Sequence, residues 1–490
     1  MKKKQSIQVN AILNVIKQGC VIVFPLVTYS YITRVLGSDN LGRYSFSDSV
    51  IQYFITIASL GVPTYAIREV ARVREDKEKM EKLTTEFFSI NVVMTIISLL
   101  TLYLIVKFVP RINKEAILIY ILSIEIIAGT LGRDWLNNVF ENFFYLTLRY
   151  IFIQTISMIL ILTLVKSKND LILYTCIMMI SYSMNYILNI YFTRKYLPYR
   201  FTFHLNLKTH LKPIIYLFCV SIAAMIYVKS DIIILGFFRS NSEVGVYSIA
   251  SNVYTVIKSL LNAVIVVAIP RISVYLGNND RKNYMSLLSG LRNVLYVFAI
   301  PSIIGLFFLS KDILAVLAPP SFAYGSNSLR ILCIALFFTV IGCFYSQAVL
   351  VPNRNEKSYF YATIISGIVN ISLNFVFIPL WGLNGAAITT VLAEIIVMFI
   401  CRRGSGAYID TFSSMKMIPL IIGCIAIAII CQLCQMFVTS LFLRIIISVF
   451  GSVIVYGIIL LVGKNEVALN GMNMIKSKIK KYKDTFYCEK

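Results

Sequence analysis

The stretches GRYSFSDSVIQYFITIAS (residues 42–59) and GVYSIASNVYTVIKSLLN (residues 245–262) decide the architecture of this chain. Aligned at their first residue, both begin with Gly and carry Tyr and Ser at the third and fourth positions. Further along, polar residues in one stretch again fall opposite polar residues in the other. This internal repeat predicts that the chain is built from two similar halves.

The polar residues of each stretch follow the spacing of a single helix face. Counted from Ser45 they stand at i+3, i+4, i+7, i+11 and i+14. An unpaired polar group that faces lipid costs several kcal/mol, so each stripe must face other helices or a wet cavity. Packing between helices would explain one stripe, but its recurrence favours a shared cavity. We expect Asp48, Gln52, Asn252 and Asn262 to contact substrate there.

The composition indicates lipid as the solvent for this fold. The chain has 490 residues, of which 58% are hydrophobic and only 14% charged, and its mean hydropathy is +0.78. Soluble domains are about a quarter charged, and a helix needs roughly twenty apolar residues to cross a bilayer. Apolar runs predict about fourteen transmembrane helices, at 11–34, 44–66, 85–107, 115–132, 144–165, 171–193, 213–237, 245–269, 292–310, 329–350, 358–379, 383–400, 414–437 and 440–463.

The repeat groups these helices. It matches the second predicted helix with the eighth, so the halves contain six helices each and share one orientation, as parallel repeats of transporters do. The predicted fold is all-α and integral to the membrane, with pseudo-symmetric six-helix bundles at 1–193 and 213–403 and a cytoplasmic linker at 194–212. Two added helices occupy 404–463, and a basic tail occupies 464–490.

The net charge of +23 reports membrane orientation. Most Lys and Arg residues lie on one side of the predicted spans, as in the cluster at 68–82 and in the tail at 464–490. Basic loops stay in the cytoplasm, so both termini are predicted to be cytoplasmic. The basic excess is explained by this topology and by contact with anionic lipid headgroups, and we expect no nucleic-acid partner.

Charged residues inside the spans are candidates for function, because a charge at mid-bilayer costs roughly 2.5–3.5 kcal/mol. Glu125 and Lys258 both fall near the predicted midplane. Arg444 lies near the end of its span, where snorkelling or structural pairing explains it. The full set is Lys17, Asp48, Glu125, Lys229, Asp231, Lys258, Glu394 and Arg444.

Lys258 is the strongest of these candidates, because the equivalent residue of the first half is Ile55. We expect it to contact an anionic substrate, with Lys17 and Lys229 adding positive electrostatic potential at other depths of the membrane. We also expect the Lys258→Ala variant to insert normally but to lose transport. The alternative is a structural pair with Glu125. Glu125 and Asp231 are predicted to bind a coupling H⁺ or Na⁺. Guanidinium groups at the inner mouth would hold a diphosphate bidentately, and these are Arg68, Arg72, Arg271 and Arg292.

Signatures of an enzyme are missing from the sequence. There is no phosphate-binding loop of the G-x-x-x-x-G-K-[ST] type. Both histidines, His204 and His210, fall in one predicted loop, and Cys431 and Cys434 form a C-x-x-C inside an apolar helix without a partner pair. We therefore predict a transporter without a metal site or cofactor.

Several segments resemble the Wzx-type polysaccharide flippases, whose superfamily includes MATE multidrug exporters and lipid II flippases. The resemblance is carried by YITRVLGSDNLGRYSFSDSVIQYF (31–54), LGVPTYAIREVARVRED (60–76), DWLNNVFENFFY (134–145) and KSDIIILGFFRSNSEVGVYSIA (229–250). It covers most of residues 5–400. It implies a V-shaped, MATE-like pair of bundles in the cytoplasmic membrane.

The resemblance also implies a substrate, an undecaprenyl-diphosphate-linked oligosaccharide moved from the cytoplasmic to the outer leaflet by alternating access. The expected partners are this lipid-linked glycan, membrane lipid, H⁺ or Na⁺, a polysaccharide polymerase and glycosyltransferases. Three alternatives stay open. A MATE-like cation-coupled drug antiporter would need an acidic, aromatic cavity, which the three in-span lysines oppose. A lipid II flippase and a membrane-embedded glycan polymerase or ligase are the others.

Overall fold

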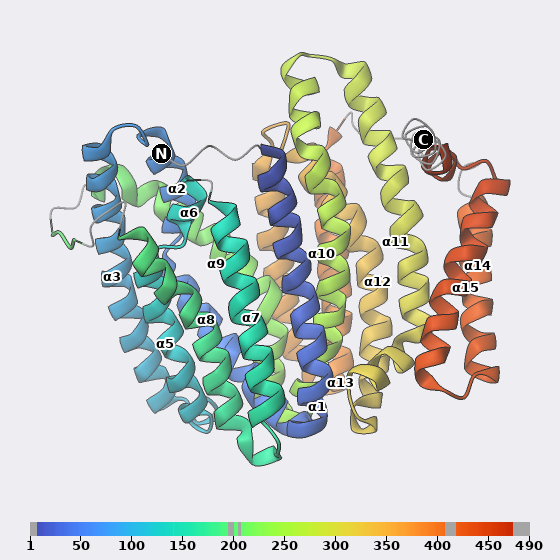
Figure 1. Ribbon diagram of the computed structural model, residues 1–490, viewed down its shortest axis with the longest axis horizontal. Coiled ribbons are helices and arrows are strands. Elements are labelled where there is room, and N and C mark those ends of the chain that lie inside the picture. The colour runs from blue at the N-terminus through green and yellow to red at the C-terminus, as the bar shows by residue number, and fades with distance from the viewer. Residues whose placement is uncertain (1–6, 141, 195–199, 204–206, 407–417, 474–490) are drawn as a thin grey trace, which may run out of the picture. The chain divides into compact units, whose positions relative to one another are not determined.

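The computed structural model describes residues 7–140, 142–194, 200–203, 207–406 and 418–473, and every regular element in these ranges is helical (Figure 1). The chain forms two compact units. Unit 1 contains residues 1–249, 317–321 and 371–383, and unit 2 contains residues 250–316, 322–370 and 384–490.

Unit 1 holds the first half of the chain and the beginning of the repeat's second copy. Its elements are α1 (Ile7–Ser59), α2 (Val62–Arg72), α3 (Lys77–Phe108), α4 (Pro110–Asn113), α5 (Ala116–Gly132), α6 (Trp135–Val139), α7 (Phe143–Leu164), η1 (Lys168–Asp170), α8 (Leu171–Thr193), α9 (Leu207–Phe238) and the start of α10 (Asn241–Gly277).

Unit 2 takes up the remainder of α10 and most of the chain that follows. Its elements are α11 (Arg281–Leu317), η2 (Pro320–Gly325), α12 (Ser326–Cys343), η3 (Phe344–Leu350), α13 (Glu356–Gly404), α14 (Ile418–Phe437) and α15 (Leu441–Val462). The residues 371–383 inside α13 belong to unit 1. η3 is a π-helical turn that continues α12 directly.

Twelve helices of the described chain are long and apolar enough to cross a membrane. Two of them are much longer than a bilayer requires: α1 has 53 residues and α13 has 49. At 1.5 Å per residue a straight α1 would measure about 80 Å, against a hydrocarbon core of about 30 Å. Each breaks at a glycine with positive φ, Gly37 at 76° and Gly382 at 56°. α13 contains two of the predicted spans, 358–379 and 383–400, whereas α1 contains 11–34 and most of 44–66, which ends in α2.

The repeated stretches meet inside unit 1. The Ser45 hydroxyl donates to the Ser248 hydroxyl at 3.2 Å, and these two residues are equivalent in the repeat. Gly42 and its equivalent Gly245 also face each other, and a Cβ atom on Gly42 would overlap the backbone carbonyl oxygen of Asn241. Only glycine allows the two backbones to approach this closely. The sequence repeat therefore corresponds to a contact between its own two copies.

A core of aromatic and aliphatic side chains fixes α2 in unit 1. Tyr65 and Phe87 contact edge to face, with ring centroids 5.5 Å apart. Buried residues of α2, α3, α6 and α9 complete this cluster. At the start of α3, the Asp76 side chain accepts a hydrogen bond from the Lys79 amide at 3.1 Å. Its hydrogen bonds and ion pair with Lys79 lower the pKa of Asp76, which keeps this N-cap charged.

The two helices added after the repeat are anchored on α11 within unit 2. Figure 1 shows α14 and α15 side by side. The Tyr456 hydroxyl donates to the Val297 carbonyl at 2.9 Å, and the Arg444 guanidinium pairs with Asp312 at 2.9 Å. Arg444 is thus held by a structural ion pair, one of the two explanations that its position in the sequence suggested.

Candidate functional site

In unit 2 Lys258 lies in a tight polar network between α10, α12 and α13. Its ammonium donates to Glu394 Oε1 at 2.8 Å, and the Tyr254 hydroxyl donates to the same oxygen at 2.7 Å. The Tyr254 and Thr339 hydroxyls lie 3.0 Å apart. Glu394 is 3% exposed, whereas the Lys258 side chain keeps 28% of its surface accessible. The ammonium is therefore held in place by a buried anion while part of the side chain stays open.

The partner of Lys258 within unit 2 is one that the sequence did not suggest. It is Glu394, which lies 136 residues along the chain from Lys258. Tyr254, one turn before Lys258, places its ring 5.6 Å from the ammonium. The i, i+4 spacing of Tyr254 and Lys258 is visible in the sequence, but only the fold shows that both meet one carboxylate.

In unit 1 Lys229 and Asp48 form a looser pair between α9 and the second segment of α1. The Lys229 ammonium lies 3.4 Å from Asp48 Oδ2, and the two side chains are 27% and 19% exposed. Gln52 donates to Asp48 Oδ1 at 3.3 Å. Three of the residues that the sequence singled out therefore come together here, at distances typical of weak contacts.

The two acids predicted to bind a coupling ion have different surroundings. Glu125 is buried on α5, and its Oε2 atom has no hydrogen-bond partner among the described residues. Asp231 is buried on α9 and accepts hydrogen bonds from Tyr247 at 2.8 Å and from Asn374 at 2.7 Å. Tyr247 and Asn374 were not expected at this position. An unpartnered buried carboxylate needs a proton or a cation, so Glu125 is the simpler candidate of the two.

The remaining candidates are less closely organised. Asn252 and Asn262 are both half-buried on α10, and Asn262 Oδ1 has no hydrogen-bond partner in the described part of the chain. The side chain of Lys17 lies outside the described residues. No group of three His, Cys, Asp or Glu in the described ranges is placed to hold a metal ion.

The arginines predicted to line an inner mouth are mostly exposed. In unit 1 Arg68 and Arg72 both pair with Glu69, at 3.0 and 3.2 Å. In unit 2 Arg271 is exposed, and the half-buried Arg292 donates to Ser289 at 3.4 Å. Glu69 neutralises part of the charge that Arg68 and Arg72 would offer to a phosphate.

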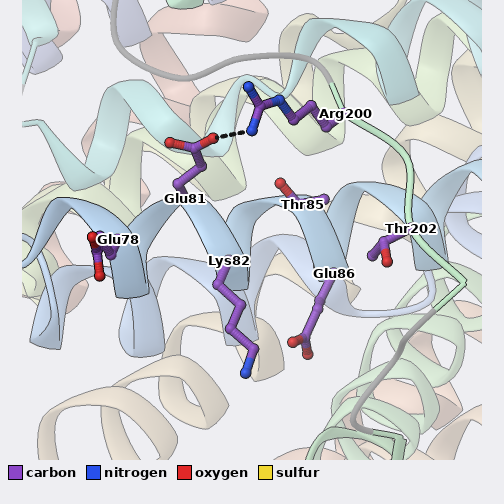
Figure 2. A pocket seen from close by; sticks show the side chains of 7 residues that line it. All are labelled: Glu78, Glu81, Lys82, Thr85, Glu86, Arg200 and Thr202. Carbon is purple, nitrogen blue, oxygen red and sulfur yellow. Dashed lines mark hydrogen bonds and ion pairs between the residues drawn. The ribbon is translucent and has the colours of Figure 1, made fainter.

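A pocket of about 460 Å³ opens beside the start of α3 in unit 1, and Figure 2 shows its lining. Arg200 pairs with Glu81 at 3.1 Å, while Lys82 and Glu86 extend from the other side of α3 (Figure 2). Three glutamates face only two basic residues in this lining, so the pocket does not favour a diphosphate. The lining residues are Glu78, Glu81, Lys82, Thr85, Glu86, Arg200 and Thr202.

His210, which the sequence placed in a loop, is buried at the start of α9 close to this pocket. The Tyr65 hydroxyl lies 3.0 Å from its Nδ1 atom, and Glu86 Oε2 lies 3.5 Å from its Nε2 atom. Aromatic contacts to Tyr65 and Phe87 hold the ring in place. The residue therefore has a structural role in joining α2, α3 and α9.

Comparisons with known proteins identify the family. The chain matches the model of the polysaccharide biosynthesis protein family over residues 7–276. A protein of Escherichia coli K12 named "Putative O-antigen transporter" is 24% identical over 407 residues, which cover 80% of this chain and 95% of that protein.

Solved structures show the same fold. The lipid II flippase MurJ in an inward closed conformation gives a TM-score of 0.77 at 18% identity, covering 92% of this chain and 97% of that one. An inward-facing multidrug resistance MATE transporter of the MOP superfamily gives 0.62 at 13% identity, covering 81% and 98%. The chain belongs to the polysaccharide biosynthesis protein family and is a multi-pass membrane transporter of the flippase type, with a MurJ- and MATE-like fold.

Proposed function

We propose that this chain moves an undecaprenyl-diphosphate-linked oligosaccharide from the cytoplasmic to the outer leaflet of the cytoplasmic membrane by alternating access. Two observations support a glycan cargo. The chain belongs to the polysaccharide biosynthesis protein family, and it is similar in sequence to a protein named "Putative O-antigen transporter". A polar route is needed because a glycan cannot cross hydrocarbon without solvation, whereas its lipid tail can stay in the bilayer.

The Lys258–Glu394 pair is the observation that carries this proposal. A diphosphate oxygen can replace Glu394 as the partner of the ammonium, because both are strong anionic acceptors. The accessible part of the Lys258 side chain is where such an exchange would begin. Lys229, Lys17, Asp48 and Gln52 of unit 1, and Asn252 and Asn262 of unit 2, are also proposed to contact the cargo. Arg68, Arg72, Arg271 and Arg292 would draw in the headgroup.

The proposed topology has fourteen crossings, because kinked α1 and α13 would each cross twice. Both termini would then be cytoplasmic, and two six-helix halves, 1–193 and 213–403, would flank the linker at 194–212. Reporter fusions test this topology. They should place Lys77, Lys208, Arg403 and Lys480 inside, and Asp39, Lys168 and Arg239 outside. An outside signal at Lys208 would contradict the two halves.

Ion coupling is proposed at Glu125 and Asp231, with H⁺ or Na⁺ as the ion. The buried Glu125 oxygen that lacks a partner supports this assignment. The proteins expected to work with the transporter are the glycosyltransferases that build its cargo and the polymerase that consumes it.

Reconstitution tests the cargo directly. Proteoliposomes containing the purified chain and a labelled undecaprenyl-diphosphate oligosaccharide should expose the glycan to an impermeant glycosidase on the opposite leaflet. Liposomes with the double variant Lys258→Met and Glu394→Gln, which removes both charges of the buried pair, are the matched control. If the wild-type chain leaves the glycan protected from the glycosidase but translocates lipid II, the chain is a lipid II flippase and the proposed cargo is wrong. Proton- or sodium-driven efflux of an organic cation would instead identify a drug antiporter.

A further inference from the structure

A second pocket of unit 1, of about 310 Å³, lies where α5 and α8 begin. It is separate from Asp48, Lys229 and the pocket beside α3. Its wall combines basic residues, amides and aliphatic side chains. The lining residues are Asn40, Arg43, Lys114, Glu115, Ile117, Leu118, Lys168, Asn169, Leu171 and Ile172.

The charge of this wall is positive. Its acid, Glu115, is buried and already forms two ion pairs. One is with Arg43 at 2.9 Å, and the other is with Arg111, which does not line the pocket, at 3.5 Å. Arg111 also donates to Asn241 and covers the face of the Phe46 ring, so it serves the fold. The positive charge that remains available comes from two lysines at the rim of the pocket.

Lys114 and Lys168 are these lysines, and the ammonium of neither has a partner within the described residues. A neighbouring lysine shows the contrast. Lys166 donates to the Leu162 carbonyl at 2.6 Å and lies over the Tyr31 ring. Lys166 is therefore tied to the fold, whereas Lys114 and Lys168 are available to a ligand.

Two helices begin beside the pocket, and each has a carboxylate residue at its N-cap. Glu115 and Asp170 occupy the N-cap positions of α5 and α8, and neither side chain caps its helix with a hydrogen bond. Helix N-termini carry partial positive charge from the peptide dipoles. Here the carboxylates of Glu115 and Asp170 offset the two dipoles, and Asp170 already accepts hydrogen bonds from the Lys166 and Ser167 amides. The preference of the pocket for an oxyanion such as phosphate therefore comes from Lys114 and Lys168.

The outer wall of the pocket exposes apolar side chains. Ile117 and Ile172 are 63% and 49% exposed, and both lie in candidate membrane spans. From Ile117 towards the C-terminal end of α5, exposed apolar side chains continue along one face of the helix at alternating spacings of three and four residues. This stripe consists of Ile117, Tyr120, Ile124, Ile127 and Leu131. The stripe therefore runs from the pocket along the candidate membrane span of α5.

We propose that this pocket binds the phosphate headgroup of an anionic membrane phospholipid, with the acyl chains lying along the exposed stripe of α5. Lys114 and Lys168 contact the phosphate, and Asn169 contacts the polar part of the headgroup. With the topology proposed above, the lipid belongs to the outer leaflet. The site is independent of the cargo and stands whether or not the proposed cargo is correct.

Native mass spectrometry of the full-length chain in detergent tests the site. Dioleoyl phosphatidylglycerol, dioleoyl phosphatidylcholine and inorganic phosphate are titrated separately, and the bound adducts are counted. We expect at least roughly tenfold preference for phosphatidylglycerol over phosphatidylcholine, since the net negative headgroup is favoured by the basic wall. Lys114→Gln and Lys168→Gln should each weaken binding about fivefold, and the double variant about thirtyfold.

Lys166→Gln is the matched control, because Lys166 lies at the same end of unit 1 but does not line the pocket. It should bind phosphatidylglycerol like the wild type, and Lys114→Arg and Lys168→Arg should retain binding. Equal binding of both lipids, or an equal loss in Lys166→Gln, would overturn the site. Displacement of the lipid by an equal concentration of inorganic phosphate would make free phosphate the ligand and overturn the lipid assignment. If the double variant does not fold, the arginine variants and Lys166→Gln decide the outcome.

Discussion

The Lys258–Glu394 pair of unit 2 and the Lys229–Asp48 pair of unit 1 bring the same chemical groups together in different ways. In unit 2 the ions are 2.8 Å apart, and a tyrosine donates to the same buried carboxylate oxygen. In unit 1 they are 3.4 Å apart and both are partly exposed. The buried pair fixes an ammonium in position, whereas the exposed pair separates at little cost. This contrast suits the proposed roles, in which Lys258 would position the substrate and Lys229 would supply positive electrostatic potential.

The largest effect is expected from Lys258→Ala, which leaves Glu394 buried without its cation. Removing one partner of a buried ion pair destabilises a protein by about 3–5 kcal/mol. We therefore expect both folded protein and glycan export to fall, whereas sequence alone predicted normal insertion. The thermal unfolding midpoint of the purified variant measures the first effect, and surface glycan measures the second.

A paired substitution separates the two roles of Lys258. Lys258→Met combined with Glu394→Gln removes both charges and should recover most of the lost stability, but not export. If the double variant exports glycan at the wild-type rate, Lys258 contacts no substrate and the pair serves only the fold.

A smaller effect is expected from Tyr254→Phe, which removes one hydrogen bond to Glu394 while keeping the ring. A hydrogen bond to a charged group contributes about 1.5–3 kcal/mol. The matched change in unit 1 is Gln52→Leu, which removes a 3.3 Å contact to Asp48 and should cost about 1 kcal/mol or less. Chemical unfolding of both variants measures the difference. Equal losses would show that the two networks are equally tight.

For Lys229→Ala we expect at most about 1 kcal/mol of destabilisation, because its pair with Asp48 is long and partly solvated. Export should nevertheless fall severalfold if the ammonium attracts the anionic cargo. Asp48→Asn is the comparison, since it releases Lys229 without removing the positive charge and should reduce export less than Lys229→Ala does. A similar loss of export in both variants would indicate that export depends on the ion pair itself and not on the positive charge of Lys229.

The smallest change in stability is expected from Glu125→Gln, at about 0.5 kcal/mol or less, since Gln keeps the volume and the Oε2 atom has no partner to lose. The dependence of export on pH and on Na⁺ should change, because Gln can bind neither a proton nor a cation as a carboxylate does. Proteoliposome transport across a pH series, with and without Na⁺, measures this. An unchanged dependence would make Glu125 structural.

The sequence predicted the helical membrane fold and the in-span charges, but not which charges pair. Periodicity and apolar runs are local properties, so α3, α5 and α8 can be found from the sequence. Lys258 and Glu394 are 136 residues apart, and Lys229 and Asp48 are 181 apart. Such pairings depend on which helix faces pack together, which no local pattern records. Tyr247 and Asn374, the partners of Asp231, were missed for the same reason.

The contact between Ser45 and Ser248, with Gly42 against Gly245, has a consequence for how this chain can have arisen. Equivalent residues that touch each other are the mark of an isologous interface, as found on the two-fold axis of a symmetric homodimer. In such an ancestor every substitution would alter both sides of the contact together. Once the two copies are fused into one chain, each can change alone. Lys258 in the second copy and Ile55 at the equivalent position of the first are such a difference, which the identical chains of a homodimer could not carry.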